Sequence, residues 1–85
     1  MDDGKLRQLD NSTCSYIMTI DRLKQRKVIL NRGGFKRPKE GGLSRKEIEL
    51  LDDIKKYEEM RRIDEYCIRC LILELAEEIK KENLE

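Results

Sequence analysis

The sequence predicts a small, mostly α-helical protein, and three observations support this fold class. The chain has 85 residues, enough for one domain at most, so we expect a single small domain over residues 1–85. After Gly42 no glycine or proline interrupts the sequence, which is rich in the helix-favouring residue types Glu, Lys, Leu, Ile and Arg. Apolar residues in this part recur at steps of three or four, which is the spacing of one helix face.

The N-terminal third contains one expected element, over residues 15–31. Residues 1–14 are largely polar, and we expect them to be flexible. A helix over 15–31 is favoured by a helical stop signal at Asn31-Arg32-Gly33. The alternative is a β-hairpin of the runs "SYIMTI" and "KVILN", although the connecting "DRLKQR" lacks the residues that tight turns prefer. Four residues would share one face of the helix: Tyr16, Ile20, Leu23 and Leu30.

Residues 32–43, "RGGFKRPKEGGL", predict a basic loop. This segment holds four glycines and the only proline of the chain. Immediately after it, Ser44 is followed three residues later by Glu47, which is the spacing of a capping box. The sequence therefore predicts that a helix begins at Ser44.

The helical region 44–82 has two interpretations. Its apolar residues do not keep a regular heptad phase, which argues against a regular coiled coil. Because polarity rises near "MRRIDEY" and Asp64 could cap a new helix, we favour two helices over about 44–60 and 64–82, folded against each other. The alternative is one long, bent helix. Six residues are expected to be buried, with a second copy or a larger partner: Leu50, Ile54, Ile63, Leu71, Leu75 and Ile79.

Charge is unevenly distributed, although the formal net charge of the chain is only +1. Residues 1–21 carry a net charge of −2, residues 22–46 carry +9 and residues 47–85 carry −6. A concentration of positive charge of this size predicts contact with a negatively charged surface. Eight side chains are the candidate binding residues: Arg22, Lys24, Arg26, Lys27, Arg32, Lys36, Arg37 and Lys39.

Three interpretations of the basic segment remain open. It could contact nucleic acid or a nucleoprotein, because Lys and Arg neutralise phosphates and release counterions. It could face the acidic C-terminal helices of its own chain, where each surface ion pair contributes about 0–1 kcal/mol. It could meet the acidic surface of a protein partner. We expect a non-catalytic binding protein whose segment 22–46 contacts nucleic acid or nucleoprotein while the C-terminal helices drive assembly. The alternative is an inhibitor or adaptor, of the type that phages and other mobile elements encode, which occupies a partner protein without contacting nucleic acid.

The cysteines predict core positions rather than a metal or redox site. Cys67 and Cys70 form a C-x-x-C within the apolar periodic stretch, and residues three apart share a helix face, so both are expected to be small core side chains. Zinc sites need four ligands, and the chain has no histidine and only three cysteines. A metal site would therefore need these two thiols from each of two chains.

Catalysis and membrane insertion are not expected. The chain has no histidine, the usual general base near neutral pH, and its adjacent carboxylate pairs would point to different sides of a helix. No apolar run approaches the roughly 20 residues of a membrane span. The odd number of cysteines and the polar N-terminus favour a cytoplasmic protein without a cofactor. Because domains of this size are marginally stable alone, we expect a homo-oligomer or a protein partner.

Overall fold

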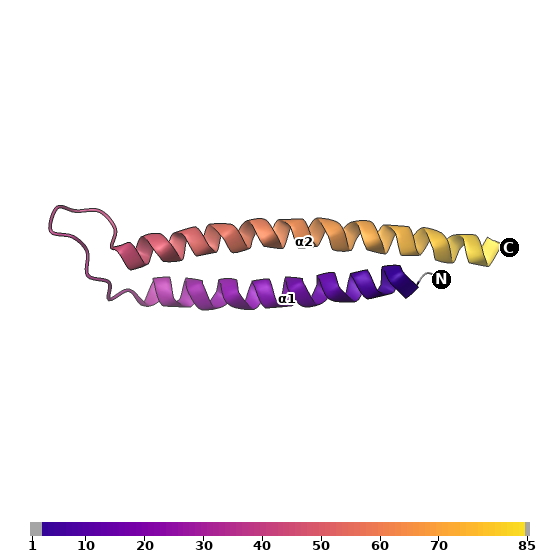
Figure 1. Ribbon diagram of the computed structural model, residues 1–85, viewed down its shortest axis with the longest axis horizontal. Coiled ribbons are helices and arrows are strands. Elements are labelled where there is room, and N and C mark those ends of the chain that lie inside the picture. The colour runs from indigo at the N-terminus through magenta and orange to yellow at the C-terminus, as the bar shows by residue number, and fades with distance from the viewer. Residues whose placement is uncertain (1–2, 85) are drawn as a thin grey trace.

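The computed structural model describes residues 3–84, which form a hairpin of two long helices. Helix α1 spans Asp3–Arg32 and helix α2 spans Arg45–Leu84. The helices run antiparallel, with the loop at one end and both chain ends at the other (Figure 1). The hairpin measures 72 × 17 × 16 Å. The described residues contain no strand, so the mostly α fold class is confirmed, and residues 15–31 are helical rather than a β-hairpin.

Helix α1 extends further toward the N-terminus than the element predicted over residues 15–31. It begins at Asp3, so residues 3–14, for which we expected flexibility, lie in the helix, while residues 1 and 2 lie outside the described residues. Helices are stabilised mainly by packing, and α2 with its 40 residues offers a surface along all of α1. Lys5, for example, donates to a carboxylate oxygen of Glu78. The first turns of α1 are thus stabilised by the C-terminal part of α2, which is distant in sequence.

The predicted start of α2 is confirmed in atomic detail. The backbone N–H of Glu47 donates to Oγ of Ser44 at 3.1 Å, and the N–H of Ser44 donates to Oε1 of Glu47 at 3.1 Å. These are the two reciprocal bonds of a capping box. At the other end of the loop, Gly33 ends α1 with a φ of 71°, a conformation that favours glycine, and its N–H donates to the carbonyl of Leu30.

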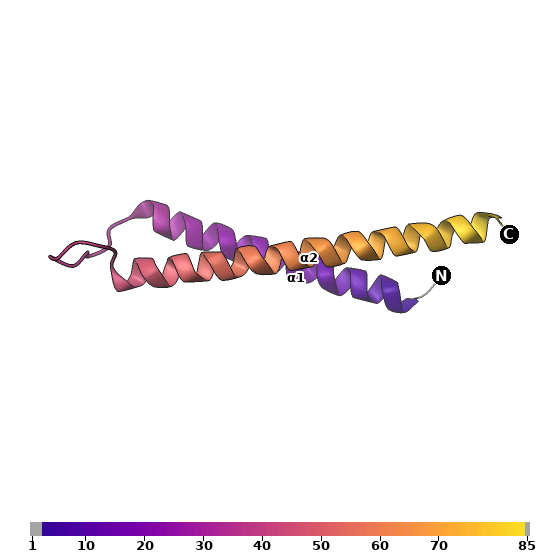
Figure 2. The ribbon, with the colours of Figure 1, turned by 90° about the horizontal axis from the view of Figure 1, so that it is seen from above.

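The two helices pack through heptads, contrary to the expectation from the apolar spacing. Steps alternate regularly between three and four along both helices, and every residue at these positions is buried or half-buried. This is the pattern of an antiparallel coiled coil, and Figure 2 shows the helices crossing at a shallow angle. The positions are 5, 9, 12, 16, 19, 23, 26 and 30 of α1, and 47, 50, 54, 57, 61, 64, 68, 71, 75 and 78 of α2.

The prediction of two C-terminal helices is wrong, because α2 is continuous and only gently curved (Figure 1). Asp64 does not cap a second helix. Its carboxylate instead accepts a hydrogen bond of 3.1 Å from the hydroxyl of Ser15 in α1. The neighbouring Tyr16 donates to Glu65 at 2.9 Å, which raises the pKa of the tyrosine because the bond stabilises the protonated phenol. The polar stretch that suggested a break therefore joins α2 to α1.

The predicted core is correct in part. Ile54 and Leu75 are buried, and Leu50 and Leu71 are half-buried. Ile63 and Ile79, however, are 62% and 43% exposed because they lie outside the heptad positions. The complete list of buried apolar residues among those described is short: Leu23, Ile54 and Leu75.

Candidate nucleic-acid interface at the loop end

A cavity opens at the loop end of the hairpin, where the basic segment meets the start of α2. Its volume is about 590 Å³, and the apolar side chains that line it are Ile29 and Phe35. Phe35 also lines a smaller neighbouring cavity with Leu50, so its ring occupies the space between the two helix ends. The charged residues that line the larger cavity are all basic: Arg32, Lys36, Arg45 and Lys46.

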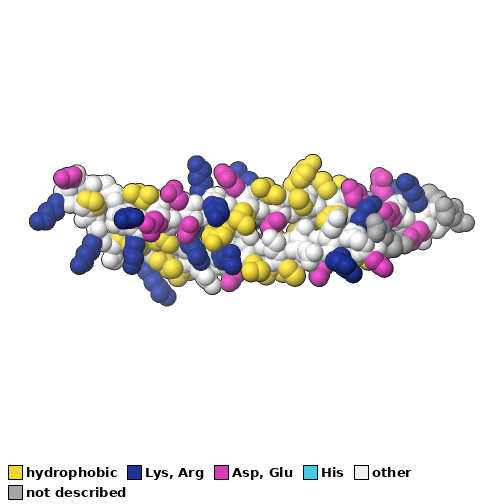
Figure 3. All heavy atoms as spheres, in the orientation of Figure 1, with side chains coloured by type: hydrophobic (Ala, Val, Ile, Leu, Met, Phe, Trp, Pro, Cys, Tyr) yellow, Lys and Arg dark blue, Asp and Glu magenta, His cyan; other side chains and the backbone are white. Residues whose placement is uncertain are grey.

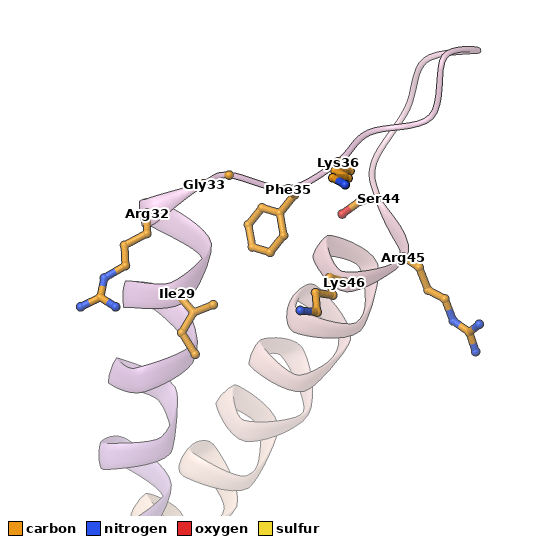
Figure 4. Close-up of a pocket in the computed structure, with 9 residues that line it drawn as sticks. Ile29, Arg32, Gly33, Phe35, Lys36, Ser44, Arg45 and Lys46 are labelled. Atoms are coloured by element: carbon orange, nitrogen blue, oxygen red, sulfur yellow. The ribbon is translucent and has the colours of Figure 1, made fainter.

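The cations form a rim around this cavity and do not converge on one point. In Figure 4, Arg32 at the end of α1 and Arg45 at the start of α2 point outward in different directions, while Phe35 points toward the gap between the helices. All four basic side chains are exposed. We name the exposed basic residues of this region that have no partner across the loop the basic end: Arg32, Lys36, Lys39, Arg45 and Lys46.

Arg37, one of the eight candidate binding residues, forms an ion pair within the chain. Its Nε and Nη2 donate to the two carboxylate oxygens of Glu47, both at 3.1 Å. The guanidinium of Arg37 and the backbone N–H of Ser44 lower the pKa of Glu47, since both favour the ionised carboxylate. In return, Glu47 raises the pKa of Arg37. This bidentate pair fastens the loop to the first turn of α2.

Arg26 and Lys27 also have acidic neighbours on α2. Nε of Arg26 lies 3.9 Å from Asp53, and its guanidinium lies 5.5 Å from the centre of the Tyr57 ring. Nζ of Lys27 lies 3.4 Å from Glu58. The internal neutralisation that the sequence left open thus applies to three of the eight candidates.

The other five candidates have no acidic partner within residues 3–84. Arg22 and Lys24 lie in the loop-side half of α1, and because they are two residues apart they point to different sides of the helix. Arg32, Lys36 and Lys39 lie at the loop end. All five side chains are exposed.

Arg45 and Lys46 complete the basic end, although they are not among the eight binding residues predicted from the sequence. They belong to the basic segment 22–46, but the predicted helix start at Ser44 separates them in sequence from the basic loop. Their position in the first turn of α2 brings them to the cavity that Arg32 and Lys36 also line. A prediction that the two helices form a hairpin would have identified them, because the hairpin brings the start of α2 next to the end of α1.

The hairpin is electrically polar along its length. The half nearer the loop, residues 22–58, carries twelve basic and six acidic residues. The other half, residues 3–21 and 59–84, carries seven basic and ten acidic residues. On the face in Figure 3, Lys and Arg side chains accordingly gather over the loop end, and Asp and Glu are more frequent toward the chain ends.

The three cysteines form no disulfide, and the expectation that Cys67 and Cys70 both belong to the core is wrong for Cys67. Cys14 and Cys67 are exposed, and Cys70 is half-buried. Within the described range 3–84, no three or more Cys, Asp or Glu side chains are grouped as a metal site requires. Neither helix, over the residues described, has the length and apolar character of a bilayer crossing.

Comparisons with protein-family models, with curated proteins and with solved structures find no match for this chain.

Proposed function

We propose that this protein is a non-catalytic binding module that holds the phosphate backbone of a nucleic acid at its basic end. The observation that carries the proposal is the composition of the loop-end cavity, since four cationic side chains and no acidic one line it. None of these four has an acidic partner within the described residues except Arg45, whose neighbour is Glu49 at 3.4 Å in the next turn of the same helix.

The arrangement of the charges supports an extended polyanion rather than one compact anion. The cations surround an opening and their long side chains are exposed, so each can reach a different phosphate. Phosphate contacts of this kind give affinity without sequence discrimination. Phe35 packs between the helix ends rather than standing free, so base stacking contributes little to the proposed interaction.

The test is the salt dependence of binding to labelled duplex DNA and single-stranded RNA, measured by fluorescence anisotropy. On duplex DNA the logarithm of the binding constant falls by about 0.9 per phosphate contact for each unit of log salt concentration. The double variant Lys36→Gln/Lys39→Gln should therefore bind more weakly, with a slope smaller by about 1.8.

A matched control is present in the same chain. Lys80→Gln/Lys81→Gln removes the same charge from the opposite end of the hairpin and should leave the slope unchanged. Equal losses in the two double variants would show that binding depends on net charge alone and would contradict a site at the basic end. Absence of binding to both nucleic acids at low salt would remove the proposed function.

A protein partner is the second candidate function, and the exposed apolar side chains favour it. Ile17, Met18, Ile63 and Leu73 are each more than half exposed. An inhibitor or adaptor of the phage-like type would use such side chains to occupy the surface of another protein. Failure to bind nucleic acid, together with a discrete complex recovered from the native host, would support this candidate.

We also propose that the chain self-associates, and its large surface area supports this. The accessible area is 7158 Å², whereas a compact monomer of 10.1 kDa exposes about 5,300 Å². An interface of standard size buries about 800 Å² on each partner, which the extra surface can supply. The buried core of the single hairpin is also small for an independent domain.

A further inference from the structure

We infer that a second copy of this chain packs antiparallel on one flank of the hairpin, the flank that carries Cys67. This inference rests on the self-association proposed above and specifies the surface and the orientation. It does not depend on nucleic-acid binding.

The flank is a continuous stripe along both helices. Its residues alternate by steps of three and four, so they share one side of each helix. Two cavities show that the stripes of α1 and α2 face the same way, because one is lined by Gln8, Asn11, Cys67 and Cys70 and the other by Ile29, Lys46 and Asp53. The Cys67 flank consists of residues 8, 11, 15, 18, 22, 25 and 29 of α1, and 46, 49, 53, 56, 60, 63, 67, 70, 74 and 77 of α2.

The centre of the Cys67 flank is uncharged. On α2 the four successive flank residues are apolar: Met60, Ile63, Cys67 and Cys70. On α1 the facing stretch, residues 8–18, contributes Gln8, Asn11, Ser15 and Met18. Met60 and Cys67 are exposed and Ile63 is 62% exposed, so the centre offers apolar surface to a partner.

The opposite flank differs at the same level. It carries Arg62, Glu65 and Arg69 on α2, where the Cys67 flank carries apolar residues. Glu65 already has Arg61 at 3.7 Å, but Arg62 and Arg69 have no acidic partner among the described residues, so their burial against another molecule would require an ionic partner for each. The central part of the Cys67 flank has no such requirement, which favours this flank for self-association.

Charges at the two ends of the flank determine the orientation of the second copy. On the loop side of the uncharged centre, Glu49 and Asp53 are already paired within the chain, with Arg45 and Arg26 respectively. Arg22 and Lys56, on the same side, have no acidic partner in the described chain. Glu74 and Glu77 lie on the other side, and Lys5 lies 3.8 Å from Glu74. A parallel copy would bring like charges together, whereas an antiparallel copy places Lys56 opposite Glu74. Glu77 then lies opposite Asp53, whose charge Arg26 already offsets within the chain at 3.9 Å.

The antiparallel arrangement is self-complementary about a two-fold axis near residue 65 of α2. Each α2 lies against the α2 of the other copy, with Met60 and Ile63 facing Cys70 and Cys67 of that copy. Each α1 lies against the other α1. Four helices then enclose the apolar centres of both flanks, and the interface is isologous, as in most protein dimers.

Analytical ultracentrifugation over a nanomolar to micromolar concentration series tests this inference. The wild-type chain should sediment with twice the monomer mass of 10.1 kDa at micromolar concentration. Ile63→Lys should raise the dimer dissociation constant by more than about tenfold, because it places an unpaired charge in the apolar centre. The control Ile72→Lys changes a 51% exposed isoleucine on the opposite flank and should leave the constant unchanged.

A charge exchange tests the orientation separately. Lys56→Glu should weaken the dimer several-fold, and the double variant Lys56→Glu/Glu74→Lys should restore it because each ionic contact is rebuilt with reversed sign. Circular dichroism would establish that each variant remains helical. A wild-type monomer at micromolar concentration would overturn both self-association and this inference. A dimer that Ile72→Lys dissociates, or that the double variant does not restore, would overturn only the flank or the orientation.

Discussion

Glu47 shows how one side chain can stabilise both a helix start and a loop. It is only 5% exposed, accepts the N–H of Ser44, and binds Arg37 with both carboxylate oxygens. The carboxylate thus caps α2, lies near the positive end of the helix dipole and holds the loop. A charge-assisted bidentate pair is among the stronger polar interactions in proteins.

This pair predicts a dependence of stability on pH. Because the folded chain lowers the pKa of Glu47 below its ordinary value of 4.5, its stabilising effect is complete above that value. The effect is lost as the pH falls through the lower pKa of the folded state. Glu47→Gln should therefore lower the melting temperature at neutral pH and reduce its further decrease between neutral pH and acid.

Glu49→Gln is the matched control for that measurement. Glu49 lies in the same turn of α2, and its side chain is 64% exposed, compared with 6% for Glu47. Its replacement should leave the acid sensitivity of the melting temperature close to that of the wild type. Equal behaviour of the two variants would show that Glu47 does not carry the predicted linkage.

In the middle of the hairpin, polar residues occupy several of the heptad positions through which the two helices pack. Thr19 is 3% exposed, and Arg61 and Asp64 lie at half-buried heptad positions of α2. Nε of Arg61 is buried without a hydrogen-bond partner, with Glu65 at 3.7 Å. A buried donor without a partner reduces stability, so this layer is a weak point of the packing.

Arg61→Leu should therefore stabilise the hairpin by about 1 kcal/mol, because it removes the unsatisfied donor and completes the apolar heptad. Urea unfolding followed by circular dichroism measures the change. Arg62→Leu, at the exposed neighbouring position, should change stability by no more than about 0.5 kcal/mol. A loss of stability in Arg61→Leu would mean that its ion pair with Glu65 outweighs the unsatisfied donor.

Two leucines of α2 test the assignment of the packed face. Leu75 is 7% exposed and Leu73 is 60% exposed, although they are separated by one residue. Leu75→Ala should cost about 2–5 kcal/mol of unfolding free energy, whereas Leu73→Ala should cost less than about 0.5 kcal/mol. The two substitutions change helix propensity equally, so thermal unfolding would compare burial alone. Similar costs at both positions would contradict the assignment of Leu75, and not Leu73, to the packed face.

The same polar layer explains which parts of the fold were predictable from the sequence. The capping box is local, so Ser44 and Glu47 predicted the start of α2 correctly. The heptads are also present in the sequence. The apolar residues at helical spacing in this part, however, are Met60 and Ile63, and each lies one position before the true heptad residue, Arg61 or Asp64. Only the contacts with α1, such as Ser15 to Asp64, show that the polar residues face inward.

At the scale of the whole molecule, the hairpin decides which cations remain available. The charge excess of segment 22–46 was evident in the sequence, but the loss of Arg26, Lys27 and Arg37 to internal pairs was not, because their partners are ten or more residues away. The hairpin also brings Arg45 and Lys46 beside Arg32. The sequence therefore predicted the overall charge of the candidate site, but not which of its cations are free of internal partners.

The separation of charge along a body 72 Å long gives the single hairpin a large permanent dipole moment along its axis. In the field of a polyanion such a body turns before contact, so that it arrives tip first and the loop touches before the helices do. Two copies paired head to tail would cancel their moments and lose this preference. Transient electric birefringence would therefore distinguish the solitary hairpin from the pair by the sign and strength of its alignment.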